Sequence, residues 1–97
     1  MTPETRNKLV QDAPRLSFEN KTALENATRC GCYFCIQLFN PAEIDEWSKD
    51  KNGDTAICPR CSVDAVIPET DSPLSTELLV EMCEHWFTRP AGVCEPA

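Results

Sequence analysis

The chain has 97 residues, enough for one small domain, and a domain of this size often needs a metal or disulfides to stabilise its modest core. Sixteen acidic and nine basic residues give a net charge of −7, which disfavours nucleic acid and anionic lipid and favours basic partners. The polar amino-terminal stretch and the lack of a long apolar run predict a cytoplasmic protein without a membrane segment. In that compartment, seven cysteines favour metal binding over disulfides.

Residues 1–29 predict two short helices that precede the cysteine-rich part of the chain. Pro3 suits a first helical position, and Pro14 is expected to end this helix because a proline cannot continue it. A second helix is predicted over about Phe18–Thr28, with Ser17 as its N-cap. Three apolar residues of this second helix are expected in the core: Phe18, Leu24 and Ala27.

The first half of the cysteine-rich region predicts a strand followed by a short helix. The stretch YFCIQLF is rich in strand-forming residues. The stretch NPAEIDEW predicts a helical turn or two, because Asn40 can cap it and Glu43, three residues later, completes a capping box. Ile44 and Trp47 are expected to pack inward from this helix.

The second half of this region predicts a loop and a hairpin. The polar stretch SKDKNGDT is expected to form a loop around Asn52 and Gly53, which are strong turn formers. The stretch TAICPRCSVDAVIP places the second cysteine pair between two short apolar runs, which favours a hairpin with the cysteines near its turn.

The last predicted element is an amphipathic helix that begins after Ser72 as N-cap, with Pro73 in its first position, and runs to Arg89. Five apolar residues share one face of it: Leu74, Leu78, Leu79, Met82 and Trp86. Three acidic residues line the opposite face: Glu77, Glu81 and Glu84. The chain is thus divided into the helical segment described above, a core over residues 30–90, and a flexible tail over residues 91–97.

Two cysteine pairs carry the clearest chemical signal. Cys32 and Cys35 are separated by two residues, twenty-two residues follow, and Cys58 and Cys61 repeat the spacing. Two intervening residues allow a tight turn to direct both sulfurs at one ion, and two such turns complete a tetrahedral shell with zinc–sulfur distances of about 2.3 Å. The separation slightly exceeds the usual window for zinc sites, and the inserted NPAEIDEW helix accounts for the excess. The sequence predicts a structural Zn²⁺ at these four residues.

Other uses of these thiols remain open. The same four ligands would suit a rubredoxin-like iron site or an iron–sulfur cluster, and a redox dithiol is a further alternative. Cys30 is expected to be a buried or spare thiol, with exchange for Cys32 as the alternative. Cys83 is expected to pack in the core, and Cys94 to be a free thiol in the tail.

The sequence does not predict an enzyme. Open catalytic zinc sites bind one water and frequently use histidine ligands, whereas this chain has one histidine, His85, on the flank of the last predicted helix. The histidine-first pattern of zinc deaminases is missing, as are Gly-rich phosphate loops and nucleophile elbows. His85 is therefore expected to be a helix-flank residue rather than a ligand or a base.

The stretch CPRC resembles a zinc knuckle of the kind found in zinc ribbons and rubredoxin-like folds. Such knuckles usually have glycine after the second cysteine, where Ile36 and Ser62 stand in this sequence. Strand-like residues after the second pair favour a zinc ribbon-like arrangement over a treble clef, in which a helix would start there. The expected fold class is a small metal-stabilised α+β domain, with knuckle hairpins, amino-terminal helices and a carboxy-terminal amphipathic helix.

From Cys32 to Phe87 the chain is similar to a group of small bacterial and phage-borne proteins described as cytoplasmic proteins. The stretches CGCYFCIQLFNPAEIDEW, TAICPRCSVDAVIP and PLSTELLVEMCEHWF carry the resemblance, and residues 1–29 lie outside it. The resemblance implies a cytosolic zinc-bearing fold without an established activity.

Two functions follow as hypotheses. The leading one is a non-enzymatic, zinc-stabilised protein-binding module of the inhibitor, immunity or adaptor type. Its acidic surface would bind a protein partner through Glu77, Glu81 and Glu84, unless these carboxylates only form a solvated helix face. The alternative is a nucleic-acid-associated zinc ribbon that regulates transcription, with three arginines near the phosphates: Arg29, Arg60 and Arg89.

Overall fold

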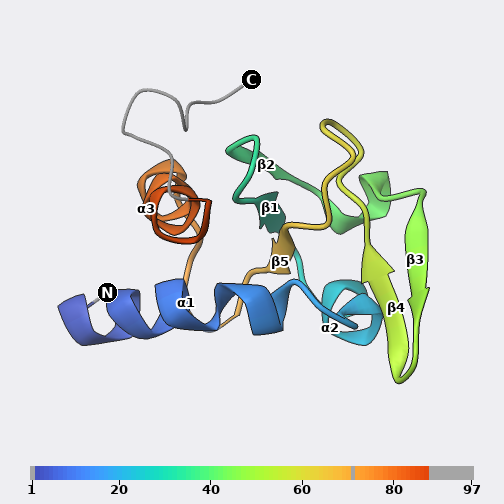
Figure 1. Ribbon diagram of the computed structural model, residues 1–97, viewed down its shortest axis with the longest axis horizontal. Coiled ribbons are helices and arrows are strands. Elements are labelled where there is room, and N and C mark those ends of the chain that lie inside the picture. Colours follow the sequence, from blue (N-terminus) through green and yellow to red (C-terminus); the bar gives the residue numbers. More distant parts are fainter. Residues whose placement is uncertain (1, 71, 88–97) are drawn as a thin grey trace.

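The protein is a small α+β domain with two antiparallel sheets (Figure 1). The computed structural model describes residues 2–70 and 72–87, so the predicted tail over residues 91–97 lies outside the described residues. The elements in chain order are helices α1 (Pro3–Leu16) and α2 (Lys21–Glu25), strands β1 (Cys30–Cys32) and β2 (Gln37–Phe39), the 3-10 helix η1 (Pro41–Glu43), strands β3 (Trp47–Asp50), β4 (Gly53–Ala56) and β5 (Val66–Pro68), and helix α3 (Thr76–Trp86).

The central sheet has the strand order β2-β1-β5, with both pairs antiparallel. Gly31, in the middle strand, lies opposite Leu38 on one side and Ile67 on the other. A Cβ atom at Gly31 would lie 3.0 Å from Leu79 Cδ1, so glycine allows α3 to approach the strand closely. Figure 1 shows α3 beside this sheet, and α1 running below both α3 and the sheet. No helix in the described ranges is long and apolar enough to cross a membrane.

The strand pairing differs from the predicted hairpin over the second cysteine pair. β4 pairs with β3 in a separate two-stranded sheet, and β5 pairs with β1. The segment SKD, expected to be part of a loop, belongs to β3, and the turn at Lys51 and Asn52 is retained. β5 pairs with β1 at the edge of the central sheet, where Val66 and Ile67 are fully buried, and burial of these two apolar side chains favours this pairing.

Helix α1 continues through Pro14, which was expected to end it. A proline inside a helix cannot donate a hydrogen bond to the carbonyl four residues earlier, here that of Val10. The indole Nε1 of Trp86 donates to this Val10 carbonyl instead. A side chain of α3 therefore satisfies the acceptor that Pro14 leaves free. Trp86 performs this role at the edge of the core, 40% exposed, rather than on the buried face of α3.

Helix α2 is shorter than predicted, and its surroundings correct three assignments. It begins after Asn20, while Ser17 caps the carboxyl end of α1 and bonds the Pro14 carbonyl. Phe18, predicted to be in the core, is 54% exposed because it lies in the bend between the two helices. Leu24 is buried as predicted.

The capping box before β3 is confirmed. The side chain of Asn40 accepts from Ala42 N, and Glu43 accepts from Asn40 N at 3.1 Å. The helix is a single 3-10 turn, so Ile44 follows it and Trp47 begins β3 instead of packing from a helix.

Helix α3 begins later than predicted, after Ser75 rather than Ser72. The Ser75 hydroxyl accepts from Leu78 N, and Leu74 remains outside the helix because its N–H donates to Glu69 at 2.8 Å. Four of the five residues predicted on its apolar face are buried: Leu74, Leu78, Leu79 and Met82.

Candidate metal centre

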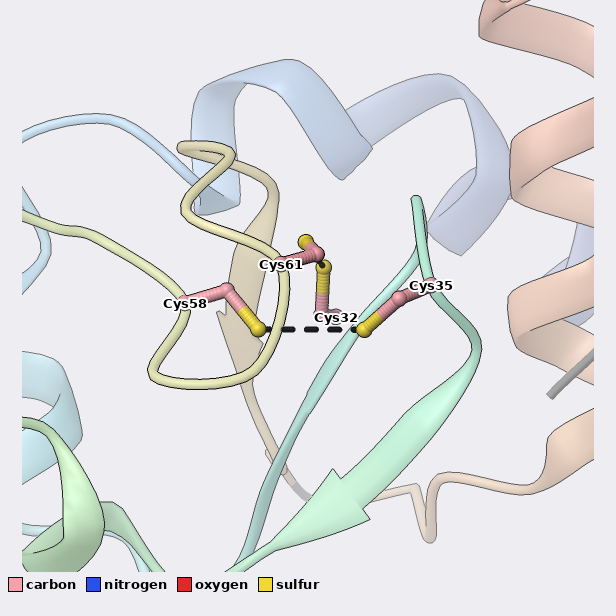
Figure 2. A group of neighbouring side chains, drawn as sticks. All are labelled: Cys32, Cys35, Cys58 and Cys61. Atoms are coloured by element: carbon pink, nitrogen blue, oxygen red, sulfur yellow. Dashed lines mark hydrogen bonds between the residues drawn. The ribbon is translucent and has the colours of Figure 1, made fainter. Parts of the chain in front are cut away.

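The fold brings together the four cysteines of the two C-x-x-C pairs. Cys32 ends β1 and Cys35 follows it in the turn to β2, while Cys58 and Cys61 lie in the loop between β4 and β5. Their Sγ atoms all lie within 4.8 Å of one another, and three of the four residues are buried. Figure 2 shows the sulfurs of the two turns directed toward one another.

The distances between the sulfurs fit one tetrahedral ion. Cys32 Sγ lies 3.6 Å from Cys61 Sγ, and Cys35 Sγ lies 3.8 Å from Cys58 Sγ. Four thiolates at about 2.3 Å from a central zinc ion would be separated by about 3.8 Å. Each of these contacts joins a cysteine of the first pair to a cysteine of the second. An ion at their centre would therefore link the two turns.

Both turns have the same backbone pattern. In the first, Phe34 N donates to Cys32 Sγ at 3.4 Å and Ile36 N donates to the Cys32 carbonyl. In the second, Arg60 N donates to Cys58 Sγ at 3.4 Å and Ser62 N donates to the Cys58 carbonyl. Amide donors directed at a sulfur favour the thiolate form, which is the form that binds a metal.

The residue after each pair has a left-handed backbone although neither is glycine. Ile36 has φ 58° and Ser62 has φ 67°. This region costs a non-glycine residue roughly 1–2 kcal/mol, and it is especially unfavourable for a β-branched side chain. The usual knuckle backbone is thus retained with residues that strain it. Ile36 offsets its strain by burial, whereas Ser62 is exposed.

Burial opposes ionisation of the thiols on the first turn. Burial, and next the nearby Cys58, raises the pKa of Cys35 to about 12, and burial also raises the pKa of Cys32. Burial raises the pKa of Cys58 as well, but the backbone N–H groups of Arg60 and Cys61 lower it overall. A divalent ion must displace protons from such thiols, so metal binding weakens in acid.

The other cysteines lie apart from this group. Cys30 is fully buried, its Sγ donates to the Phe39 carbonyl at 3.5 Å, and burial raises its pKa to about 12. It therefore packs as a small core residue beside the four thiols. Cys83 is buried on α3, and Cys94 lies outside the described residues.

The remaining predicted site residues do not converge on the cysteines. His85 is exposed near the end of α3, where its ring contacts that of Trp86 edge-on and its Nε2 lies 3.4 Å from Gln11 Nε2. Glu81 forms an ion pair with Arg6 of α1, so this carboxylate of the predicted stripe is already engaged within the chain. Glu77 is exposed and Glu84 half-buried.

The arginines assigned to the nucleic-acid alternative are also engaged. Arg29 binds the Glu69 carboxylate at 2.7 Å, and Arg60 binds Glu43 at 3.0 Å. Arg89 lies outside the described residues. The Arg60–Glu43 pair joins the second turn to η1. No local sequence signal could have revealed this pair, because its partners are seventeen residues apart and come together only in the fold.

No family model, curated protein or solved structure matches this chain. The resemblance to small bacterial and phage-borne proteins therefore stays an expectation from the sequence. The structure supports its coarser part, a small α+β domain in which four cysteines cluster and could bind a metal ion.

Proposed function

We propose that the chain is a non-enzymatic protein-binding module with a zinc ribbon-like core, in which Cys32, Cys35, Cys58 and Cys61 bind a structural zinc ion. The observation that carries the metal assignment is the approach of four sulfurs within 4.8 Å of one another, two from each turn. When all four positions of a tetrahedral ion are thiolates, none is left for a catalytic water. Zinc would supply no bond-breaking chemistry here, only a link between two turns.

The rest of the chain supports a purely structural role for this ion. The first turn joins two strands of the central sheet, whereas the second lies in a loop that runs from one sheet to the other, since β4 pairs with β3 and β5 pairs with β1. Hydrogen bonds from Phe34 N and Arg60 N hold two of the sulfurs in place, and burial shields three of the cysteines from water. A closed site of this kind stabilises the fold by an amount of the order of 10 kcal/mol.

Elemental analysis of the purified protein tests the metal assignment. One zinc per chain is expected, with iron as the alternative that uses the same ligands. Replacement of the metal by Co²⁺ should give the visible absorption of a tetrahedral four-thiolate site, and a Cys61→Ser variant should alter that spectrum. Cys30→Ser is the matched control, because its thiol lies outside the four and should leave the spectrum unchanged. A metal-free, fully folded protein would contradict the proposal.

The charge distribution supports a basic protein partner over nucleic acid. Of the nine basic residues, Arg89 lies outside the described ranges, and seven of the remaining eight form ion pairs with carboxylates. Several carboxylates in the described ranges make neither an ion pair nor a side-chain hydrogen bond: Glu4, Glu25, Asp45, Glu46, Asp64, Glu77 and Glu84. Few positive charges are left to contact phosphates, and many negative charges are left to attract a basic surface.

Two measurements test the binding function. Metal-loaded protein used as bait in extract of the native host should retain a stoichiometric basic protein, and the complex should dissociate as salt is raised. Repeatedly empty captures would overturn the proposal. Gel-shift titrations with DNA and RNA at low salt should show no complex, and tight, salt-dependent binding there would favour the nucleic-acid alternative.

A further inference from the structure

A cavity of about 270 Å³ lies between α2, η1 and β3. Its walls are mainly apolar: Leu24, Ala27, Pro41, Ala42 and Trp47. Asn40 and Glu25 supply the polar part of the lining. None of the four clustered cysteines lines it, so this cavity is separate from the metal centre.

The walls are held in place before any partner binds. The capping box between Asn40 and Glu43 fixes η1, and Asn40 Oδ1 accepts from Ala42 N at 2.9 Å. On the opposite side, Trp47 pairs with Ala56 across the β3–β4 hairpin. The Lys21 ammonium lies 5.2 Å from the centre of the indole ring and restrains it further. A cavity with preorganised walls loses little entropy when it is filled.

Acidic residues without an ion-pair partner lie in the lining of this cavity and next to it in the chain. Glu25 lines it, and the exposed residues Asp45 and Glu46 lie in the short segment between two lining residues. None of the three makes an ion pair or a side-chain hydrogen bond in the described part of the chain. Lys21, whose ammonium lies over the Trp47 ring, pairs with Asp54, and Arg60 pairs with Glu43 of η1.

The volume of the cavity and the negative charge beside it together indicate which kind of side chain occupies it. The cavity is smaller than most small-molecule sites, which range over about 300–1,000 Å³, and it suits a single apolar side chain. Interfaces often depend on one such anchor that fills a pocket, surrounded by charged contacts. We propose that this pocket receives one leucine-, methionine- or phenylalanine-sized side chain of a protein partner, and that lysine or arginine residues flanking this anchor face Glu25, Asp45 and Glu46. This inference rests on the proposed binding function and specifies its surface and its partner's chemistry.

An ion pair links the metal centre to η1, which forms one wall of the pocket. Arg60, inside the second cysteine turn, donates to Glu43 Oε1 at 3.0 Å, and Glu43 in turn accepts from Asn40 N. The turn that holds two of the sulfurs therefore also supports η1. All binding measurements should accordingly use metal-loaded protein.

Defined peptides test the pocket by two-dimensional NMR of the metal-loaded protein at low salt. The probe is an acetylated, amidated pentapeptide, Lys-Arg-Leu-Arg-Lys, and its controls place Gly at the centre or Glu at the four flanking positions. Shifts confined to the lining residues and to Asp45 and Glu46 are expected for the probe. The Gly peptide is expected to bind at least fivefold more weakly than the probe, and the Glu peptide is expected not to bind.

Matched variants assign the binding to this surface. Ala42→Phe should fill the pocket, and the triple variant Glu25→Gln, Asp45→Asn, Glu46→Gln should remove its charge. Each should weaken the probe at least tenfold, while Glu77→Gln with Glu84→Gln on α3, outside the pocket lining, should weaken it less than threefold by reducing the overall negative charge. Zinc content and thermal midpoint establish that each variant is folded. Four outcomes would each overturn the inference. They are an equal loss of affinity in the α3 variant, equal affinity of the Leu and Gly peptides, absence of probe binding, and binding of indole but not of the peptides.

Capture of the native partner distinguishes a wrong pocket assignment from a wrong proposed function. If a basic protein is captured equally well by wild type and Ala42→Phe, the pocket assignment is wrong while the binding function stands. If wild type captures nothing and no peptide binds, both are wrong.

Discussion

The two cysteine turns have the same backbone but different support. The first turn connects β1 and β2, two adjacent strands of one sheet, and its Ile36 is 2% exposed. The second lies between β4 and β5, which belong to different sheets, and its Ser62 is exposed. Local sheet pairing can therefore form the first turn without a metal. The second has no such pairing and depends on the metal and on contacts with distant residues.

Asn20 makes contacts that connect the segment around the second turn to distant residues. Its side-chain amide donates to the Val66 carbonyl at 2.8 Å, and its oxygen accepts from Ala56 N at 3.2 Å. Ala56 and Val66 lie at the two ends of the segment that contains the second turn. The same amide also donates to the Leu16 carbonyl at the end of α1. One buried side chain therefore holds both ends of this segment against the amino-terminal helices.

Metal removal should have the largest effect on stability, and it should affect the second turn before the first. Chelation is expected to lower the free energy of unfolding by an amount of the order of 10 kcal/mol, enough to unfold a domain of this size. At chelator concentrations that remove part of the metal, hydrogen exchange should accelerate first at Cys58 N, which bonds Val63, and last in β1. An unchanged thermal midpoint after complete removal would contradict the structural role of the ion.

Asn20→Ala should have the next largest effect, because it removes the side-chain partner of three backbone groups, two of them in buried hydrogen bonds. We expect a loss of about 3 kcal/mol in the free energy of unfolding, measured by urea denaturation of the metal-loaded protein. Asn26→Ala is a suitable control, since Asn26 Nδ2 makes one exposed bond to the Thr22 carbonyl. A similar loss in both variants would show that Asn20 is not the special support of the second turn.

Glycine at the two left-handed positions should have opposite effects. Ile36→Gly relieves strain but removes a buried side chain, so a net loss of about 2 kcal/mol is expected. Ser62→Gly relieves strain at an exposed residue, so a gain of about 0.5 kcal/mol is expected after the greater flexibility of the unfolded chain is included. Thermal unfolding of both variants with metal bound measures the difference. Changes of the same sign would contradict the contrast between the turns.

Glu69 should have a smaller effect than Ile36, and it stabilises the part of the chain that leads into the first turn. Its carboxylate accepts from Leu74 N and pairs with Arg29, which precedes β1. The Leu74 N–H and then Arg29 lower the pKa of Glu69, so its stabilisation is present above the ordinary glutamate pKa and is lost as pH falls through the lowered value. We expect Glu69→Gln to cost about 1 kcal/mol at pH 7.

Carbon-13 NMR of the Glu69 carboxyl in the wild type should report this lowered pKa directly. Denaturation of wild type and Glu69→Gln at pH 7 and below pH 4 should show the difference between them shrinking in acid, as the linkage requires. A pKa at or above the ordinary value would contradict the assignment.

The sequence alone determined the features that depend on residues close in the chain. The spacing of the cysteines identified the four sulfurs that come together, Asn40 and Glu43 identified the capping box, and the apolar periodicity of Leu78, Leu79 and Met82 identified the buried face of α3. Each of these depends on hydrogen bonds or side-chain directions within one or two turns of chain. Such local geometry is encoded within a short window of sequence.

Only the tertiary structure decided what depends on distant partners. Helix α1 passes Pro14 because Trp86 satisfies the Val10 carbonyl, and β5 leaves the predicted hairpin to pair with β1, where Val66 and Ile67 are fully buried. The cavity beside Trp47 likewise requires α2, η1 and β3 to meet. These contacts join residues far apart in the chain, and the free energy that selects them comes from burial and hydrogen bonding that arise only when the segments meet.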